Sequence, residues 1–331
     1  MSTIKDVATR AQVSVSTVSK AYNNYSEISE ATRARIFQAA QALGYIPNKA
    51  AVQLSRGKFP NVGLIVHSLA DETTQDEHTH RLLGGVHSRI SENGHDLVLY
   101  TTKQIKRKNL NYVDFCRHHS LVGAIIHGLD RDDPYLEPLL SSPIPCVLID
   151  NELESPSTAF VTTDNVQAAE DVINLLAAKG HRHICHILGT SVAAVTEQRK
   201  QGVLQAAHKN NLPAPVFIDG EFNEAIAYTS TQTLLRAHPQ VTAIFAASDL
   251  MALGASRAIT ESGHIPGGDI ALIGFDGIKS LEYTRPAIAT VYQDFHEMGR
   301  LAVDTLFRIA KEKKFTTKNY VPHKLIPRET V

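Results

Sequence analysis

The chain has 331 residues, and its 43% hydrophobic and 20% charged content is that of an ordinary globular protein of two or three domains. Because the sequence contains neither a signal peptide nor a run approaching ~18 apolar residues, we expect a protein that is neither secreted nor membrane-spanning. The net charge of -1 combines an acidic remainder with a basic segment 1–58, which has eight Lys and Arg against three acidic residues and predicts a polyanionic partner.

Residues 3–23, TIKDVATRAQVSVSTVSKAYN, predict two short helices joined by a tight turn. Thr3 can cap the first helix, with Asp6 as the acidic half of a capping box. Ser14 can cap the second helix, whose outward face carries small, polar and basic side chains. This arrangement is typical of a helix-turn-helix that reads DNA, although helical periodicity alone also allows a three-helix bundle that binds protein.

A third helix and a short linker segment follow. The third helix is expected to begin near Ser29 and to end at Gly44, a residue type that commonly stops helices. In the segment 45–58, YIPNKAAVQLSRGK, Asn48 can cap a short helix that runs to Leu54. Because a helix of about two turns is marginal in isolation, we expect this hinge to become helical only when a partner holds it. A plain linker is the alternative.

From Asn61 onward, apolar strands alternate with longer helical segments. The expected strands are 62–66, 96–100, 122–127, 145–150, 183–188, 216–219, 242–247 and 270–276. The expected helices are 81–93, 110–118, 165–179, 197–209, 224–237 and 249–262. The alternation predicts parallel sheets covered on both faces, and its two series of similar length predict two doubly wound domains with a cleft between them.

Three charged residues are candidates for a site in that cleft, since ligands of such sheets bind at the carboxyl ends of the strands. Asp150 and Asp276 each end a predicted strand, and Arg199 lies at the start of a helix beyond the loop 189–197. Two carboxylates and a guanidinium that meet in one cleft can bind sugar hydroxyls or another polar metabolite. Turn or strand caps are the alternative for the aspartates, and a solvated side chain is the alternative for Arg199.

Other residues with metal-binding or catalytic chemistry are not expected to form a site. The segment 180–186, GHRHICH, resembles a set of metal ligands, but strand side chains alternate between faces, so no metal is expected there. Cys116, Cys146 and Cys185 are expected to be buried free thiols. The sequence shows no nucleotide-binding glycine loop and no nucleophile with its base, so we expect no cofactor and no enzyme.

The chain resembles the lactose/galactose-repressor (LacI/GalR) family of bacterial transcription regulators over nearly its whole length. The motifs that carry the resemblance are TIKDVA, VSVSTVSKAYN, ISEATRARIFQAAQALGYIPN, GLIV, ASDLMALGASRAI, IALIGFDG and QDF. The first three together are highly specific. The resemblance implies an α/β fold with a three-helix helix-turn-helix head and a hinge helix. Two doubly wound parallel-sheet subdomains, similar to those of periplasmic binding proteins, would follow.

The resemblance also implies where the domains begin and end. The DNA-binding domain would span 1–46, and the hinge helix would span 47–59. The effector-binding and dimerisation domain would span 60–331. Within it, one subdomain would comprise about 60–162 plus 291–320, and the other would comprise 163–290 plus 321–331.

In this family a dimer reads a palindromic operator, and the family motifs assign DNA contacts residue by residue. Val15, Ser16 and Lys20 match base-reading positions, where Lys20 could donate to guanine and Val15 could touch a thymine methyl group. Leu54 matches the leucine that two subunits push into a central minor-groove step, which kinks the DNA. Positions that hold phosphates are matched by Thr3, Ser14, Thr17, Asn23 and Asn48.

The effector positions of the family are matched by Asp150, Phe160, Arg199, Phe222, Ser248, Asp276 and Phe295. Phe222 and Phe295 could stack on the apolar face of a sugar ring, with core packing as the alternative, above all for Phe160. Asp249 is expected to cap a helix. The resemblance implies a cytoplasmic bacterial repressor controlled by a small sugar or sugar-derived metabolite. The alternative is a cytoplasmic sugar-binding or sugar-modifying protein with an incidental helical N-terminus.

Several features depart from the family pattern. Gln12 stands in the turn where Gly is usual, and left-handed backbone there would cost about 1 kcal/mol. The segment 67–85 lacks the usual aromatic pair and is rich in acidic and His residues, which leaves the ligand open. Asp304, on the helix after QDF, argues against a phosphoprotein corepressor. No leucine heptad precedes the end at Val331, which predicts a dimer rather than a tetramer.

Overall fold

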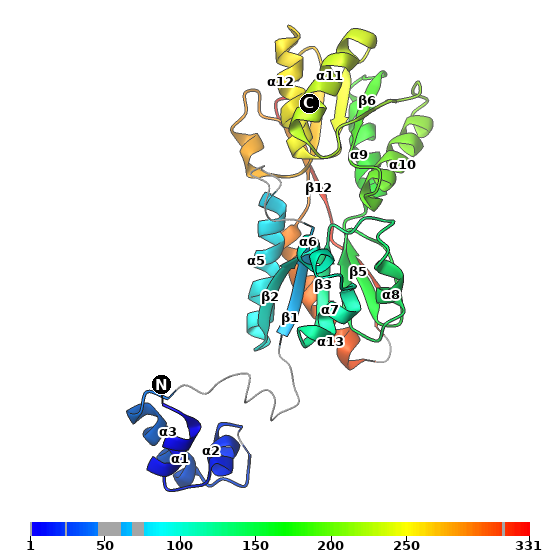
Figure 1. The fold of residues 1–331 in the computed structure, drawn as a ribbon. Helices are drawn as coiled ribbons and strands as arrows, with labels where there is room; N and C mark the ends of the chain where they lie inside the picture. Colours follow the sequence, from blue (N-terminus) through cyan, green and yellow to red (C-terminus); the bar gives the residue numbers. More distant parts are fainter. Residues whose placement is uncertain (1, 24, 46–60, 68–75, 313–314) are drawn as a thin grey trace. The chain divides into compact units, whose positions relative to one another are not determined.

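The computed structural model describes residues 2–23, 25–45, 61–67, 76–312 and 315–331 (Figure 1). It divides into two units, Met1–Pro60 and Asn61–Val331, each with its own hydrophobic core. The predicted hinge, with Asn48 and Leu54, lies outside the described residues. Within the described ranges, no helix combines the length and the apolar character that a bilayer crossing requires.

The first unit is a cluster of three helices, as predicted. All three begin at a side-chain cap, because Thr3, Ser14 and Ser29 each accept a hydrogen bond from the backbone N–H three residues later. Their apolar faces close on one small core, in which Val18 and Ile36 are fully buried. The helices are α1 (Ile4–Arg10), α2 (Val15–Tyr22) and α3 (Glu30–Ala42).

The turn between α1 and α2 contains backbone strain at the position where Gly was expected. Gln12 has a φ of 51°, which is the left-handed region that costs a non-glycine residue about 1 kcal/mol. The turn is closed by the N–H of Val13, which donates to the carbonyl of Ala8 at 3.0 Å. The helix-turn-helix geometry is therefore kept, at some cost in stability.

The second unit contains two six-stranded sheets, one in each of two lobes, and this confirms the predicted α/β class. The first lobe has strand order β11-β5-β4-β3-β1-β2, and all of these strands are parallel. Its strands are β1 (Asn61–Val66), β2 (Asp96–Thr101), β3 (Leu121–His127), β4 (Cys146–Ile149), β5 (Thr158–Thr162) and β11 (Lys318–Tyr320).

The second lobe has strand order β12-β10-β9-β8-β6-β7, and only its edge strand β12 runs antiparallel to its neighbour. Its strands are β6 (Ile184–Leu188), β7 (Val216–Asp219), β8 (Ala243–Ala246), β9 (Ala271–Asp276), β10 (Ala289–Tyr292) and β12 (Lys324–Ile326). A 3-10 turn, η1 (Lys279–Glu282), follows β9.

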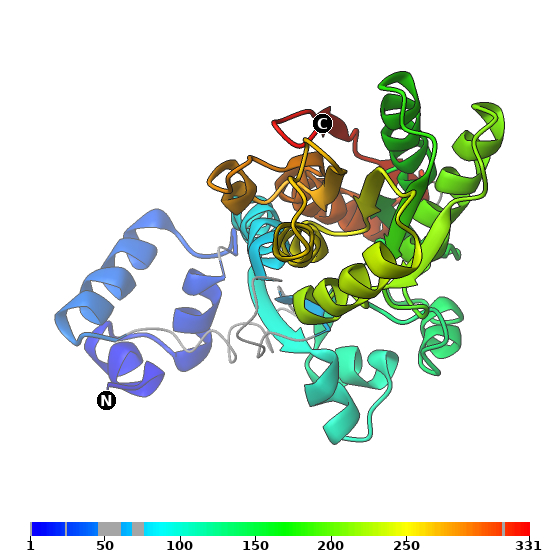
Figure 2. The ribbon, with the colours of Figure 1, turned by 90° about the horizontal axis from the view of Figure 1, so that it is seen from above.

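Helices cover both faces of each sheet, because the parallel strands are apolar on both sides. In the first lobe, α5 (Asp76–Glu92) and α13 (Phe295–Lys311) cover one face, and α6 (Thr102–Arg107), α7 (Tyr112–His118) and α8 (Leu136–Leu140) lie on the other side. In the second lobe, α9 (Asn165–Ala178) and α10 (Ala194–Lys209) cover one face, and α11 (Glu224–Ala237) and α12 (Asp249–Glu261) cover the other (Figure 2).

The chain passes from one lobe to the other after β5, again after β10 and again after β11. The strands and helices predicted between 62 and 276 are all present, with ends shifted by a few residues. The elements that were not predicted are α6, α8, β5, β10, β11 and β12. These elements contain at most six residues, and β11 and β12 contain three each, which is too short for periodicity to reveal them.

Candidate functional site

The outward face of α2 presents the residues predicted to read DNA bases. Val15 is an apolar side chain that is 40% exposed, and Ser16 beside it is also exposed. The ammonium group of Lys20 lies 2.5 Å from a carboxylate oxygen of Glu27, and this pair raises the pKa of Lys20. Glu27 had not been predicted to have a role. Glu27 therefore occupies one of the three donors of the Lys20 ammonium group.

The residues predicted to hold phosphates gather mostly at the N-terminal ends of α1 and α2. Thr3 is exposed and forms the predicted capping box with Asp6. The hydroxyl oxygens of Ser14 and Thr17 lie 2.8 Å apart at the start of α2, where the helix dipole favours an anion. Asn23 lies at the other end of α2 and donates to the carbonyl of Ser19 at 2.9 Å.

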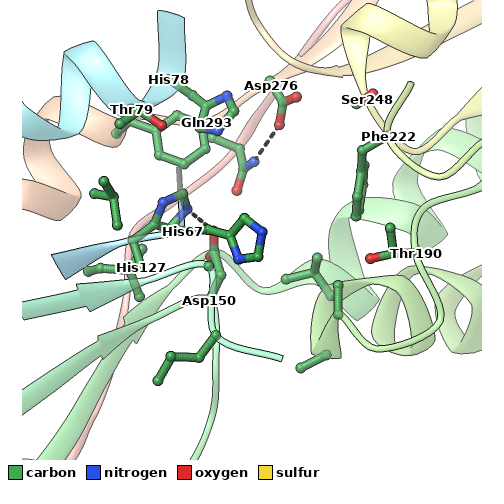
Figure 3. A pocket seen from close by; sticks show the side chains of 18 of the residues that line it. His67, His78, Thr79, His127, Asp150, Thr190, Phe222, Ser248, Asp276 and Gln293 are labelled. Atoms are coloured by element: carbon green, nitrogen blue, oxygen red, sulfur yellow. Dashed lines mark hydrogen bonds and ion pairs between the residues drawn. The ribbon is translucent and has the colours of Figure 1, made fainter. Parts of the chain in front are cut away.

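A cavity of about 550 Å³ lies between the two lobes of the second unit (Figure 3). Its walls come from the carboxyl ends of strands in both sheets, which is where ligands of such sheets bind. The first lobe supplies Val66, His67, His78, Thr79, His127, Gly128, Leu129, Asp130, Ile149, Asp150 and Phe295. The second lobe supplies Thr190, Val192, Ala193, Ala194, Val195, Arg199, Glu221, Phe222, Ser248, Leu250, Asp276 and Ile278, with Gln293 at the crossover after β10.

Arg199 lies in the second turn of α10 and is buried, with only 3% of its surface exposed, so it is not a solvated side chain. Its Nε donates to Asn165 Oδ1 at 2.9 Å, and its Nη1 donates to the carbonyl of Ala247. The guanidinium carbon lies 3.6 Å from the ring centroid of Phe275. Burial lowers the pKa of Arg199, and nearby carboxylates, chiefly that of Asp276, oppose this shift. An arginine remains charged in this setting.

Asp150 lies directly after β4 and faces the cavity from the first lobe (Figure 3). Its carboxylate accepts from the hydroxyl of Thr162 at 2.7 Å and lies 3.8 Å from Nε2 of His127. Burial alone would raise the pKa of Asp150, but His127, Thr162 and Arg199 together hold it below its usual value. The carboxylate is therefore ionised and can accept hydrogen bonds from a ligand.

Asp276 faces Asp150 from the end of β9 and is oriented by Gln293, whose Nε2 donates to it at 3.0 Å (Figure 3). Behind it, Asp249 is fully buried and accepts from the backbone N–H of Ile278 at 2.7 Å and from Thr290 at 2.6 Å. Burial raises the pKa of both aspartates, with Arg199 opposing the shift at Asp276 and the charge of Asp276 adding to it at Asp249.

The helix cap predicted at Asp249 is instead made by the preceding residue. The hydroxyl of Ser248 accepts from the backbone N–H of Met251 at 3.2 Å, and Ser248 also lines the cavity. Asp249 joins α12 to the segment after β9 through its bonds to Ile278 and Thr290. Its role is therefore to hold the wall that carries Asp276.

The three predicted aromatic residues have different surroundings. Phe222 and Phe295 line the cavity from opposite lobes. Phe222 follows β7, and its ring lies so close to Gly189 that a Cβ there would meet it at 2.0 Å, so this contact requires glycine. Phe160 does not line the cavity, because it lies on β5 and packs in the first-lobe core, 5.6 Å from the ring of Tyr320. Phe160 therefore packs in the core, which was the alternative prediction for this residue.

Backbone strain is concentrated at this cavity. Four of its lining residues have positive φ without being glycine: Asp150 (59°), Glu221 (50°), Phe222 (53°) and Asp276 (123°). Such conformations cost on the order of 1–3 kcal/mol each and recur at functional sites. The strain places side chains from three different strand ends in one space.

Several lining residues were not predicted. The ring of His78, on α5, lies 5.7 Å from that of His127 and 5.2 Å from that of Phe295. Burial lowers the pKa of His78 to about 3, so this imidazole is neutral. Gln293 is fully buried beside Asp276, and His67 and Thr79 also line this space. The sequence shows that 67–85 is rich in His, but it does not show which of these residues line the cavity.

The other chemistry-bearing residues form no second site within the described part of the chain. Cys116, Cys146 and Cys185 are buried free thiols, and burial raises the pKa of each. His186 is buried, and its Nδ1 bonds with the carbonyl of Phe245 at 2.9 Å. Among the residues described, no three His, Cys, Asp or Glu side chains are placed to hold a metal ion.

Known proteins share both parts of this architecture. Residues 3–48 match the bacterial regulatory proteins of the lacI family, and residues 173–331 match the periplasmic binding protein-like domain. The sequence is 28% identical to the probable HTH-type transcriptional repressor ExuR of Bacillus subtilis (strain 168), over 94% of this chain and 92% of that protein.

Two solved structures extend the similarity to the whole chain. The lac repressor dimer bound to operator and the anti-inducer ONPF has a TM-score of 0.86 at 27% identity, covering 99% of this chain and 98% of that one. The complex of the transcriptional regulator CelR with cellobiose has a TM-score of 0.75 at 27% identity, covering 100% of both chains. These regulators therefore share both the helix-turn-helix unit and the two-lobed unit of this chain.

Proposed function

Because the chain belongs to the LacI family of bacterial regulatory proteins, we propose that it is a sequence-specific DNA-binding repressor controlled by a sugar-type ligand in the interlobe cavity. The repressor would act as a homodimer in the bacterial cytoplasm, with one α2 in each half of a palindromic operator. The main support for the proposal is that one chain contains both a basic helix-turn-helix and a cavity that charged side chains line from both lobes.

The proposed control depends on hydrogen bonds that link the lobes at the cavity. Asp150 of the first lobe accepts from Thr162, and the amide of Asn165 donates to Thr162 at 3.3 Å. Asn165 in turn accepts from Arg199 of the second lobe at 2.9 Å. A ligand that contacts Asp150 and Arg199 would change the relative stability of the lobe arrangements, and hence the population able to bind DNA.

We assign the DNA contacts by the same family relationship. Val15, Ser16 and Lys20 would read bases, and Leu54 would wedge the minor groove at the dimer axis. The remaining head residues predicted to hold phosphates would fix the register. We also propose subdomain boundaries at 162/163 and 320/321, at the ends of β5 and β11, and place the third after Tyr292, because the predicted 290/291 falls within β10.

The named relatives are regulators, and we propose that this chain likewise catalyses no reaction. The carboxylates of the cavity are held by hydrogen bonds from Thr162 and Gln293, as suits binding. A cytoplasmic sugar-binding or sugar-modifying protein would have a similar cavity, but we would not expect it to bind DNA.

DNA binding and its dependence on salt test the proposal. The purified protein should select a palindromic sequence from random duplex DNA and bind it with an affinity that falls steeply with salt. A protein that makes 6–10 phosphate contacts loses roughly 10³–10⁵ in affinity between 50 and 200 mM salt. A scrambled duplex of equal length and composition is the control. Failure to select any sequence, with weak salt-insensitive binding, would favour the sugar-binding alternative.

A further inference from the structure

The charged groups that line the cavity are predominantly acidic. The carboxylates are those of Asp130, Asp150, Glu221 and Asp276, and among the described lining residues Arg199 alone carries a guanidinium or ammonium group. A ligand in this space therefore meets a surplus of negative charge.

Arg199 is poorly placed to pair with a ligand anion. Two of its nitrogens already donate to the oxygens of Asn165 and Ala247, and its plane lies on the ring of Phe275. Asp276, on the cavity wall, also interacts with its charge, so much of that charge is balanced within the protein. A site built for a phosphate or a carboxylate would instead offer a guanidinium fork with both arms open.

Two of the three imidazoles in the lining are not available to a ligand anion. His78 is neutral because burial lowers its pKa to about 3. The ring of His127 lies 3.8 Å from the carboxylate of Asp150 and is directed at it. Arg81 acts on His78 electrostatically but donates to the carbonyls of Gly277 and Gln293, at 3.5 and 3.0 Å, and is not part of the lining.

A buried oxygen without a protein partner shows what the cavity needs instead. Gln293 must direct its Nε2 at Asp276, because a carboxylate can only accept, and this leaves Oε1 as a buried acceptor with no bond in the described structure. The side chain extends into the cavity beside Asp276 (Figure 3). Together with the carboxylates of Asp150 and Asp276, it forms a set of acceptors that calls for ligand donors.

We propose that the cavity selects an uncharged polyhydroxylated ligand, an unphosphorylated sugar without a carboxylate, and rejects its anionic analogues; this rests on the proposed effector function of the same site. Sugar hydroxyls donate to carboxylates and to the Gln293 oxygen, whereas phosphate and carboxylate oxygens would face other acceptors. Phe222 and Phe295 provide apolar surfaces from opposite lobes, and about 550 Å³ lies within the ~300–1,000 Å³ of small-ligand pockets.

The test compares neutral sugars with analogues that differ only in charge, using calorimetry on the full-length protein. The panel contains glucose, galactose, ribose and cellobiose, with glucuronate, galacturonate, glucose 6-phosphate, ribose 5-phosphate and glucosamine as the matched charged compounds. We expect a neutral sugar to bind and its matched anion to bind at least about 100-fold more weakly, since like-charge contacts cost several kcal/mol. The amino sugar should bind at least as well as its neutral parent.

Charge variants at the cavity wall test the cause. Asp130 is half-buried in the lining, and Asp130→Lys should improve the binding of the anion relative to the neutral sugar by at least about tenfold. The isosteric Asp130→Asn is the matched control and should give a smaller change in the same direction. Circular dichroism and thermal unfolding confirm that both variants fold.

Three outcomes would overturn the inference. They are an anion that binds the wild-type protein as tightly as its neutral partner, an unchanged selectivity in Asp130→Lys, and a panel in which nothing binds. None of these bears on DNA selection and its salt dependence, which are measured without any sugar. Failure of the ligand class is therefore distinguishable from failure of the repressor function.

Discussion

At the scale of single residues, the charged groups of the cavity are each oriented by a neighbour. Thr162 holds Asp150, Gln293 holds Asp276, and Asn165 holds Arg199. Such supporting bonds reduce the reorganisation that a ligand must drive, and they offset the strain of left-handed backbone at Asp150 and Asp276. The site is therefore organised before a ligand arrives.

His186 provides a residue-scale prediction about pH. Burial lowers its pKa to about 4, so between about 6.5 and 4 the unfolded chain binds a proton that the folded chain does not. The free energy of unfolding should therefore fall as the pH drops through this window. Urea unfolding at pH 7.5 and 5.0 should show that His186→Phe, which keeps an aromatic ring, loses about 2 kcal/mol less than the wild type.

The control for this prediction is the exposed neighbour His183. The variant His183→Gln should keep the wild-type dependence on pH. If His186→Phe loses as much stability on acidification as the wild type does, the buried imidazole does not supply the pH dependence assigned to it.

Residue types at strand ends predicted the three central charged residues of the cavity, and the fold was needed for most of its other lining residues. Asp150, Asp276 and Arg199 could be predicted because parallel sheets bring strand ends together. His78 and Gln293 could not, since His78 lies on α5 rather than at the end of a strand, and Gln293 lies at a crossover between lobes. Whether an aromatic residue lines the cavity or the core, as at Phe160, likewise depends on packing that a single sequence does not reveal.

At the scale of elements, we propose different roles for α2, which would read bases, and for the hinge, which would insert Leu54 into the minor groove. The caps of α1 and α2 were evident in the sequence because Thr3, Asp6 and Ser14 have local partners. The pair between Lys20 and Glu27 was not, because Glu27 lies in the loop after α2 and reaches back to it. This pair orients the Lys20 side chain from outside α2.

The hinge supplies the prediction at this scale. We expect Leu54→Ala to weaken binding to the selected operator far more than binding to scrambled duplex DNA, because the wedge contributes only at a kinked central step. A loss of about 1–3 kcal/mol on the operator, against little change on the scrambled duplex, is the expected size, and fluorescence anisotropy measures both. Equal losses on the two duplexes would contradict the wedge.

At the scale of the whole molecule, the segments that cross between the lobes connect cavity residues of one lobe to those of the other. The connection between the lobes runs from Thr162, the last residue of β5, to Asn165, the first residue of α9, so the bonds from Asp150 to Arg199 pass along a covalent connection between lobes. The doubly wound class was predictable from the alternation of strands and helices, whereas the returns between lobes near residues 290 and 320 came only from the family resemblance, and the strands β10, β11 and β12 were not predicted. These late, short strands decide which lobe each segment joins.

We propose that a ligand in the cavity sets the affinity for DNA, and the variant Arg199→Ala tests this control. The variant should bind the operator within about threefold of wild type in the absence of sugar, because coupling concerns the ligand-bound state alone. It should also lose the change in operator affinity that the sugar identified by calorimetry causes in the wild type. Arg236→Ala, on the exposed surface of α11, is the matched control, and thermal unfolding checks that Arg199→Ala is folded.

The decisive measurement is operator affinity by fluorescence anisotropy, with and without that sugar, for the wild type, Arg199→Ala and Arg236→Ala. We expect the sugar to change the operator affinity of the wild type and of Arg236→Ala and to leave that of Arg199→Ala unchanged. A folded Arg199→Ala protein that responds to the sugar as the wild type does would contradict it.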